Sequence, residues 1–399
     1  MLEQNPVGKL GRFAQEALEH VSRATSQDIW LSMADELSML LVFAGLRPEE
    51  PELLGRTLSL GITDPILKQT LFQTVPLRDF DENPFWLEGL DGGSARVSYR
   101  PGGAEPVATW PVHVGLNFLR QGSHFFNQTL LGNEPLPATI TANPKTNCSN
   151  ACDGCYRAVA GFVRPDAHFV TTHVRELATE YKSRFPDLGL ENLRLVSIVT
   201  GCEPTPEKEV EMFLGVMDAY RAHGFSPEFI FSTNLVNDAA DMRRLRDAGA
   251  IGYVSTVEVF DDALRSKVWG KLKGQKTFAE HLETLAKARE IFQFAEAALV
   301  LGADSYDGIH RGIDALSRVG ASISAGIPRS YTPHQLALLH SDVWAFGFGY
   351  FVEPFRRIYA LNAQIGSTTQ YIRKVASGWL AQRAGGVATA GLLPYRYRA

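Results

Sequence analysis

The chain has 399 residues, of which 45% are hydrophobic and 21% charged, a composition typical of a globular protein with a substantial core. The formal net charge of -5 gives no basic footprint for a nucleic-acid backbone and weighs against a DNA or RNA substrate. No apolar run is long enough to cross a membrane, and the first residues lack the pattern of a signal peptide. With few cysteines as well, we expect a protein of the reducing cytoplasm.

Residues 1–136 are expected to form a mainly helical extension. Apolar residues recur at helical spacing over 13–21. Strand-like segments at 96–99 and 107–110 flank a turn rich in proline and glycine, which predicts a β-hairpin, and a further helix is expected over 114–131. We interpret this extension as a cap on the main domain. A surface that recognises a peptide or a partner protein is the alternative.

From residue 137 the pattern changes to strands that alternate with helices. The expected strands cover 138–142, 194–199, 228–231, 253–257, 296–301 and 322–327. The expected helices cover 170–185, 207–223, 238–248, 277–293 and 307–319. Such alternation predicts an α/β fold of parallel β-α-β units, and six strands suit a partial (β/α)6 barrel of the TIM type over 137–341. In such barrels the functional residues lie on the loops that follow the strands.

The remaining segment, 342–399, is expected to be a C-terminal extension of helical and aromatic character. Six aromatic residues lie between Trp344 and Phe355, and a helix is expected around 370–383. No cysteine occurs in this segment.

Three of the four cysteines, Cys148, Cys152 and Cys155, lie within eight residues with the spacing C-x3-C-x2-C. Three such close thiols cannot all pair with one another, so a shared metal centre is a better interpretation than a disulfide framework. Structural zinc would need a fourth ligand such as Cys202 or His168. An iron–sulfur cluster also takes four ligands. Three cysteines without a clear fourth would leave one iron open to a ligand that is not protein.

This run, together with Tyr156 directly after it, resembles the cysteine motif of the radical S-adenosylmethionine (SAM) superfamily. The resemblance covers about residues 137–330. It implies a [4Fe-4S] cluster on the three cysteines, with SAM as a second cofactor that chelates the open iron. It also implies a partial barrel fold and an external one-electron donor such as flavodoxin or ferredoxin.

The segment after the second expected strand resembles the Gly-Gly-Glu-Pro segment of this superfamily, whose backbone meets the SAM amino group. It reads Gly201, Cys202, Glu203 and Pro204, so that a cysteine replaces the second glycine. The thiol of Cys202 is open to three interpretations. We favour a small buried side chain, because free cysteine often behaves as a small hydrophobe. A catalytic thiol that faces the substrate and a cluster ligand are the others.

Two further loops resemble cofactor-binding segments. Ser232, Thr233 and Asn234 follow the third expected strand and are similar to the segment near the SAM ribose, although they equally suit a polar strand end. Glu258 follows the fourth expected strand, where several radical SAM families carry a glutamate that reaches the ribose or the methionine. Without that context a glutamate is more often a solvated partner of an ion pair.

The family often has Arg-Gly after the fourth strand, and its arginine meets the SAM carboxylate. This chain has Trp-Gly there, so we expect Arg265 or Lys271 to supply the positive charge instead. Gly302 lies in a stretch that resembles the one in contact with adenine. Arg329 follows the sixth expected strand and is expected to bind a substrate carboxylate or phosphate, or to close the rim of the barrel.

The resemblance implies an enzyme in which the reduced cluster splits SAM into methionine and a 5′-deoxyadenosyl radical that takes hydrogen from the substrate. The chain lacks cysteines for an auxiliary cluster and the Asp-x-His-x-x-Gly signature of cobalamin binding. We therefore favour a small metabolite or natural-product intermediate, changed by rearrangement, lyase chemistry, oxidation or epimerisation. Modification of a ribosomal peptide is the alternative. A non-catalytic, metal-stabilised scaffold is the alternative from another class.

Overall fold

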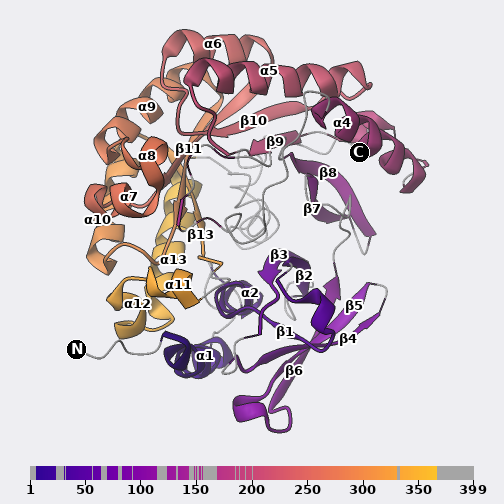
Figure 1. The fold of residues 1–399 in the computed structure, drawn as a ribbon, viewed down its shortest axis with the longest axis vertical. Helices are drawn as coiled ribbons and strands as arrows, with labels where there is room; N and C mark the ends of the chain where they lie inside the picture. Colours follow the sequence, from indigo (N-terminus) through magenta and orange to yellow (C-terminus); the bar gives the residue numbers. More distant parts are fainter. Residues whose placement is uncertain are drawn as a thin grey trace. The chain divides into compact units, whose positions relative to one another are not determined.

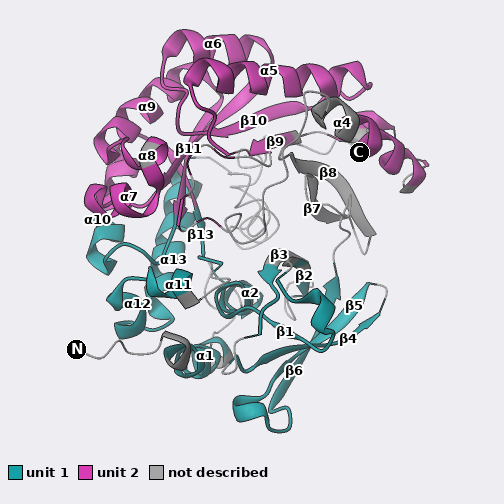
Figure 2. Cartoon of the chain, viewed as in Figure 1, with its two compact units in different colours: residues 1–116, 300–311, 325–399 teal, residues 117–299, 312–324 magenta. Residues whose placement is uncertain are grey.

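The computed structural model divides the chain into two compact units (Figure 2). The first comprises residues 1–116, 300–311 and 325–399, and the second comprises 117–299 and 312–324. These limits differ from the expected boundaries at 136 and 341, since residues 117–136 belong to the second unit and residues 300–311 and 325–341 to the first. The residues that the structure describes are 6–23, 31, 33–55, 57–63, 70–79, 83–91, 93–114, 124–131, 134–142, 148, 150, 152–153, 155, 169–184, 186–187, 189–193, 195–199, 201–329 and 333–365.

The N-terminal part of the first unit contains a six-stranded sheet in the order β1-β4-β5-β6-β2-β3 (Figure 1). Its strands are β1 (Arg47–Pro48), β2 (Thr57–Thr63), β3 (Thr70–Pro76), β4 (Phe85–Asp91), β5 (Ser94–Tyr99) and β6 (Ala108–Val114). Between residues 47 and 114 the extension therefore consists mainly of strands, and the expectation of a mainly helical extension is wrong there. The expected hairpin is present as β5 and β6, which pair antiparallel from Ser94 opposite His113 to Tyr99 opposite Ala108. Pairing between distant segments, such as β2 with β6, leaves no local signal.

Helices complete the first unit. They are α1 (Pro6–Arg23), α2 (Met33–Ala44), α11 (Pro333–Ala337), α12 (Ser341–Ala345) and α13 (Gly349–Gln364). The C-terminal aromatic residues pack against the first two helices: the ring of Phe43 lies 4.6 Å from that of Phe13 and 5.1 Å from that of Phe351. The expected C-terminal aromatic cluster thus belongs to a packed core. The helix expected around 370–383 lies outside the described residues.

The second unit contains a seven-stranded sheet in the order β13-β12-β11-β10-β9-β8-β7. Its strands are β7 (His124–Leu131), β8 (Glu134–Ala142), β9 (Leu195–Val199), β10 (Glu228–Thr233), β11 (Ala250–Glu258), β12 (Phe294–Val300) and β13 (Ser322–Gly326). The pairs from β8 to β12 are parallel, and all six expected strands are present. Residues 124–131 form a strand antiparallel to β8, so the helix expected there is wrong. The two aromatic residues at its start, Phe125 and Phe126, suit a strand.

The helices of the second sheet agree with the five that the sequence predicts. These are α4 (Phe169–Arg184), α5 (Pro206–Ala222), α6 (Ala239–Asp247), α9 (Phe278–Ile291) and α10 (Tyr306–Arg318). Two short helices that were not expected, α7 (Asp262–Val268) and α8 (Gly270–Gly274), follow β11. β7 and β13 are the two ends of the strand order, so the described part of the sheet is an open β-α-β array. No helix among the described residues is both long and apolar enough to span a membrane.

Candidate metal and cofactor site

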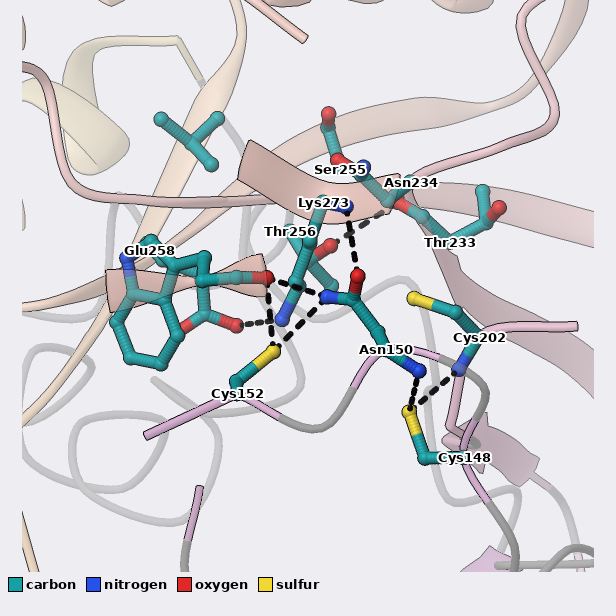
Figure 3. A network of polar contacts seen from close by, with 12 residues as sticks. Cys148, Asn150, Cys152, Cys202, Thr233, Asn234, Ser255, Thr256, Glu258 and Lys273 are labelled. Atoms are coloured by element: carbon teal, nitrogen blue, oxygen red, sulfur yellow. Dashed lines mark hydrogen bonds and ion pairs between the residues drawn. The ribbon is translucent and has the colours of Figure 1, made fainter. Parts of the chain in front are cut away.

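The loops that follow the parallel strands of the second unit bring the expected site residues together (Figure 3). Parallel strands end at the same edge of a sheet, so loops far apart in the sequence meet there. The loop after β9 reaches the cysteine loop, because the backbone N–H of Cys202 donates to Sγ of Cys148 over 3.3 Å. β10 and β11 are also joined, since the hydroxyl of Thr256 donates to the carbonyl of Thr233 over 3.4 Å.

The cysteine loop places hydrogen-bond donors on the thiols of Cys148 and Cys152. Sγ of Cys148 accepts from the backbone N–H of Asn150 as well as from Cys202. Sγ of Cys152 accepts from the side-chain amide of Asn150 over 2.9 Å and donates to the carbonyl of Trp269 over 3.0 Å. Burial raises the pKa of the Cys152 thiol to about 11, and nearby Lys273 opposes this shift. Without metal, Cys152 therefore keeps its proton at neutral pH, and metal binding would release it.

The three thiols of the cysteine loop suit an iron–sulfur cluster, because the cysteines of a [4Fe-4S] cluster each bind a different iron. Within the described part of the chain, no three His, Cys, Asp or Glu side chains could hold one metal ion. N–H donors to the ligating sulfurs are a further feature that tunes such clusters. His168, the other candidate for a fourth zinc ligand, lies outside the described residues.

Cys202 is a buried thiol beside the cysteine loop. Its hydrogen bond with Cys148, followed by burial, raises the pKa of the Cys202 thiol far above its ordinary value. A neutral thiol is a poor nucleophile, so the geometry favours the small buried side chain over the catalytic thiol. The other residues of this segment differ in exposure: Glu203 is buried, Gly201 is half-buried and Pro204 is exposed.

Glu209, a buried residue on α5 that the sequence did not single out, ties the loop after β9 to the end of β10. One carboxylate oxygen accepts from the backbone N–H of Glu203 over 3.2 Å, and the other accepts from the hydroxyl of Thr233. The Thr233 hydroxyl also accepts from the backbone N–H of Leu235 and of Val236. Thr233 therefore has a structural role at the strand end.

Asn234 and its neighbour Ser232 are both buried at the end of β10. The Asn234 amide donates to the carbonyl of Leu272 over 3.4 Å, while its Oδ1 has no partner among the described residues. A buried acceptor without a partner is costly. It is available for a donor group on a ligand.

Glu258 and Lys273 form an ion pair next to the thiols. Glu258 is the only described residue other than glycine with a positive φ, 63°, and it lies where the β11–β12 register shifts. Backbone strain of this kind is concentrated at functional sites. Burial lowers the pKa of Lys273, but Glu258 and then the thiols of Cys202 and Cys152 outweigh it and raise the pKa. Lys273 therefore stays protonated and charged although its side chain is largely shielded from water.

Lys273, which was not singled out from the sequence, is the cation that lies next to the thiols. The guanidinium of Arg265 donates to the carbonyls of Val257, over 2.5 Å, and Val259, and this residue is only 1% exposed. It ties α7 to the end of β11. The Lys271 side chain lies outside the described part of the structure.

Ser255, His281 and Arg265 form a buried chain that superficially looks catalytic. Ser255 Oγ lies 2.7 Å from His281 Nδ1, and Arg265 NH1 lies 3.1 Å from His281 Nε2. Because arginine can only donate, Nε2 accepts and Nδ1 carries the proton. His281 therefore donates to Ser255 and cannot act as its base. Burial, followed by nearby Lys276 and Arg265, lowers the pKa of His281 far below its ordinary value, so the ring stays neutral.

The other expected site residues are Tyr156, Gly302 and Arg329. Tyr156 lies outside the described residues. Gly302 and Arg329 belong to the first unit. The carbonyl of Gly302 accepts from the backbone N–H of His340 over 2.8 Å, and its φ of +127° requires glycine. The backbone conformation of this turn therefore explains why position 302 is a glycine.

No protein-family model and no curated protein matches this sequence. Solved structures overlap with parts of the chain. Radical SAM enzymes are among them. Methylornithine synthase (PylB) is 16% identical, with a TM-score of 0.40 over 61% of this chain and 68% of that chain.

Two further overlaps are shorter. Coproporphyrinogen III oxidase (HemN) from Escherichia coli, a radical SAM enzyme, is 15% identical, with a TM-score of 0.37 over 55% of this chain and 51% of that chain. SuiB from Streptococcus suis, bound to precursor peptide SuiA, is 17% identical, with a TM-score of 0.35 over 47% of this chain and 38% of that chain. The matched region thus spans about half of HemN and less of SuiB. The functional argument therefore rests on the residues of the site.

Proposed function

We propose that this chain is a radical SAM enzyme. The observation that carries the proposal is the C-x3-C-x2-C loop after the first parallel strand, with N–H donors to the thiols of Cys148 and Cys152. Cys148, Cys152 and Cys155 hold a [4Fe-4S] cluster. When bound, the cluster and SAM supply the one-electron cleavage that gives methionine and a 5′-deoxyadenosyl radical, which takes hydrogen from an unactivated carbon.

The side chains around the thiols bind and orient the cofactor. Lys273 presents a fixed positive charge that suits the SAM carboxylate, and its partner Glu258 suits the amino group or the ribose. The buried Oδ1 of Asn234 accepts from a ribose hydroxyl. None of these groups has to act as a strong base, because the radical performs the hydrogen abstraction. Their contribution is position and the exclusion of water.

For the substrate, we infer a small metabolite or natural-product intermediate, with the reaction ending as rearrangement, elimination, oxidation or epimerisation. Two features of the sequence support this choice over peptide maturation and radical methylation: the absence of cysteines after Cys202 and the absence of a cobalamin signature. The enzyme works in a reducing cytoplasm with flavodoxin or ferredoxin as the electron donor, because such a cluster is sensitive to oxygen.

The test is anaerobic purification and cluster reconstitution, followed by assays of iron, sulfide and zinc. We expect about four iron atoms per chain and 5′-deoxyadenosine after addition of SAM and a reductant. Replacement of Cys148, Cys152 and Cys155 by alanine should abolish both. A protein that binds only zinc and forms no 5′-deoxyadenosine would overturn the enzyme and favour the metal-stabilised scaffold. Deuterium transfer from candidate substrates into 5′-deoxyadenosine would then identify the substrate.

A further inference from the structure

Asn150, inside the cysteine motif, is a buried residue whose side chain joins two parts of the site. Only 5% of it is exposed. Its amide contacts Trp269, between α7 and α8, and Leu272 in α8, more than a hundred residues later in the chain, and also a thiol of its own loop. Figure 3 shows it between Cys152 and Cys148, with Lys273 above it.

The oxygen of the Asn150 amide holds the backbone that carries Lys273. Oδ1 accepts from the N–H of Leu272 over 2.6 Å and from the N–H of Lys273 over 3.2 Å. The position of the Lys273 backbone is therefore fixed to the cysteine loop. A second tie lies beside it, because the N–H of Asp153 donates to the carbonyl of Val268 over 3.1 Å.

The nitrogen of the same amide donates a hydrogen bond to the sulfur of Cys152. Nδ2 donates to Sγ of Cys152 over 2.9 Å and to the carbonyl of Trp269. In the metal-free chain the Cys152 thiol also donates to that carbonyl. A cysteine bound to iron has lost its proton, so this second bond is lost on metal binding. The two hydrogens of the amide then remain, one for the sulfur and one for the carbonyl.

Gly270 makes this close approach possible. Its φ is +69°, and a Cβ there would lie 2.2 Å from the backbone oxygen of Asn150 and 3.2 Å from Oδ1. Any other residue at this position would push the two segments apart. The Trp-Gly pair, Trp269 and Gly270, therefore suits Asn150 in two ways. The carbonyl of Trp269 accepts from the Asn150 amide, and the missing side chain of Gly270 leaves room for the Asn150 backbone.

We propose that Asn150 is a positioning residue with two separable effects: its oxygen sets the place of Lys273, and its nitrogen donates to the Cys152 sulfur and raises the reduction potential of the cluster. Hydrogen bonds to cluster sulfurs stabilise the more negative, reduced form. The inference rests on the proposed function and adds to it a determinant of cofactor binding and of electron affinity.

Two substitutions separate the effects. Asn150→Asp keeps an oxygen for Leu272 and Lys273 but removes the donor to the sulfur. It should lower the midpoint potential by at least about 59 mV, a tenfold change for a one-electron couple, and leave the KM for SAM within twofold. Asn150→Leu removes both groups without adding charge. It should lower the potential and also raise the KM for SAM about tenfold.

The matched control is Asn237→Asp in the same unit. Asn237 accepts from Lys276 over 2.5 Å and from Thr284 over 3.4 Å, and it has no hydrogen bond to sulfur among the described residues. Its potential and its KM should equal those of the wild type. Potentials are measured by redox titration followed by electron paramagnetic resonance, in protein whose iron content matches the wild type.

The outcomes are distinct from those of the proposed function, which the loaded wild type tests by itself. If the wild type binds the cluster and cleaves SAM while both Asn150 variants keep its potential, the inference about the sulfur is overturned. If Asn150→Leu keeps the wild-type KM, the inference about Lys273 is overturned. Should Asn150→Leu not fold, Gly270→Ala replaces it: displacement of Asn150 should raise the KM, and an unchanged KM overturns the positioning role.

Discussion

Two cations, one buried and one half-buried, follow the same strand, β11, and differ in what surrounds them. Arg265, on α7, directs its guanidinium to two backbone carbonyls and to a neutral histidine. Lys273, on α8, pairs with Glu258 at a strained backbone position and lies over the ring of Trp269 at 5.5 Å. One cation completes the hydrogen bonds of the fold. The other keeps a charge beside the thiols.

The comparison shows that burial of a positive charge does not by itself mark a binding site. Donors that are satisfied by carbonyl groups stabilise the turn that they bridge, because those carbonyls would otherwise lack partners. Lys273 instead pairs with the carboxylate of Glu258, whose backbone has a strained positive φ, and such strain is concentrated at functional sites. The sequence points to Arg265 or Lys271 for the positive charge and does not single out Lys273.

The largest expected effect that separates the two cations is on stability. Arg265→Lys keeps the charge but removes the fork that reaches both carbonyls. We expect the free energy of unfolding to fall by about 3 kcal/mol, as for other buried charges that lose their partners. Urea denaturation measures the change. The exposed Arg244, which pairs with Asp241 over 3.1 Å, is the control, and Arg244→Lys should cost less than about 0.5 kcal/mol. Equal losses would contradict the structural role of Arg265.

The next effect is on activity. Lys273→Met should lower kcat/KM for 5′-deoxyadenosine formation about 100-fold, equivalent to about 2.7 kcal/mol, by removing the charge beside the cofactor. The free energy of unfolding should fall less than in Arg265→Lys, because the side chains of Lys273 and Glu258 are both partly exposed to water. Lys267→Met, at an exposed site on α7, is the control. An activity of Lys273→Met close to the wild type would remove Lys273 from the site.

A third buried cation, Lys276, provides a pH test. Burial lowers its pKa to about 7, although Glu280 partly opposes this. Between that value and the ordinary value of about 10.4, the unfolded chain binds more protons than the folded one. The free energy of unfolding therefore rises with pH across this window, by at most about 1.4 kcal/mol per unit. The difference between wild type and Lys276→Met, from urea denaturation at pH 7.5 and 9, isolates this contribution. The prediction is wrong if the free energy of unfolding of the wild type, minus that of Lys276→Met, falls as pH rises.

The smallest effect is expected at Cys202. The backbone N–H of Cys202 donates to Sγ of Cys148. Cys202→Ala retains this contact, because it does not involve the side chain. Iron content should stay at the wild-type level and activity should fall at most about threefold, equivalent to about 0.7 kcal/mol. Cys202→Ser gives the same comparison with a polar side chain. Loss of iron in either variant would restore the interpretation of Cys202 as a ligand.

The sequence by itself determined the features that depend on neighbours in the chain. The six strands and five helices from residue 138 to 327 follow from the local alternation of apolar residues, and the cysteine motif needs only eight consecutive residues. Glu258 was named from the resemblance to radical SAM enzymes, and its positive φ was not foreseen.

Only the tertiary structure decided the features that depend on distant segments. The antiparallel sheet of the first unit forms by pairs such as β2 with β6, and residues 124–131 become a strand because β8 pairs with them. Lys273 rather than Arg265 faces the thiols because Asn150 and Gly270 fix the turn before α8. Such choices depend on hydrogen bonds and close contacts made after the chain has folded, and the local sequence pattern does not contain them.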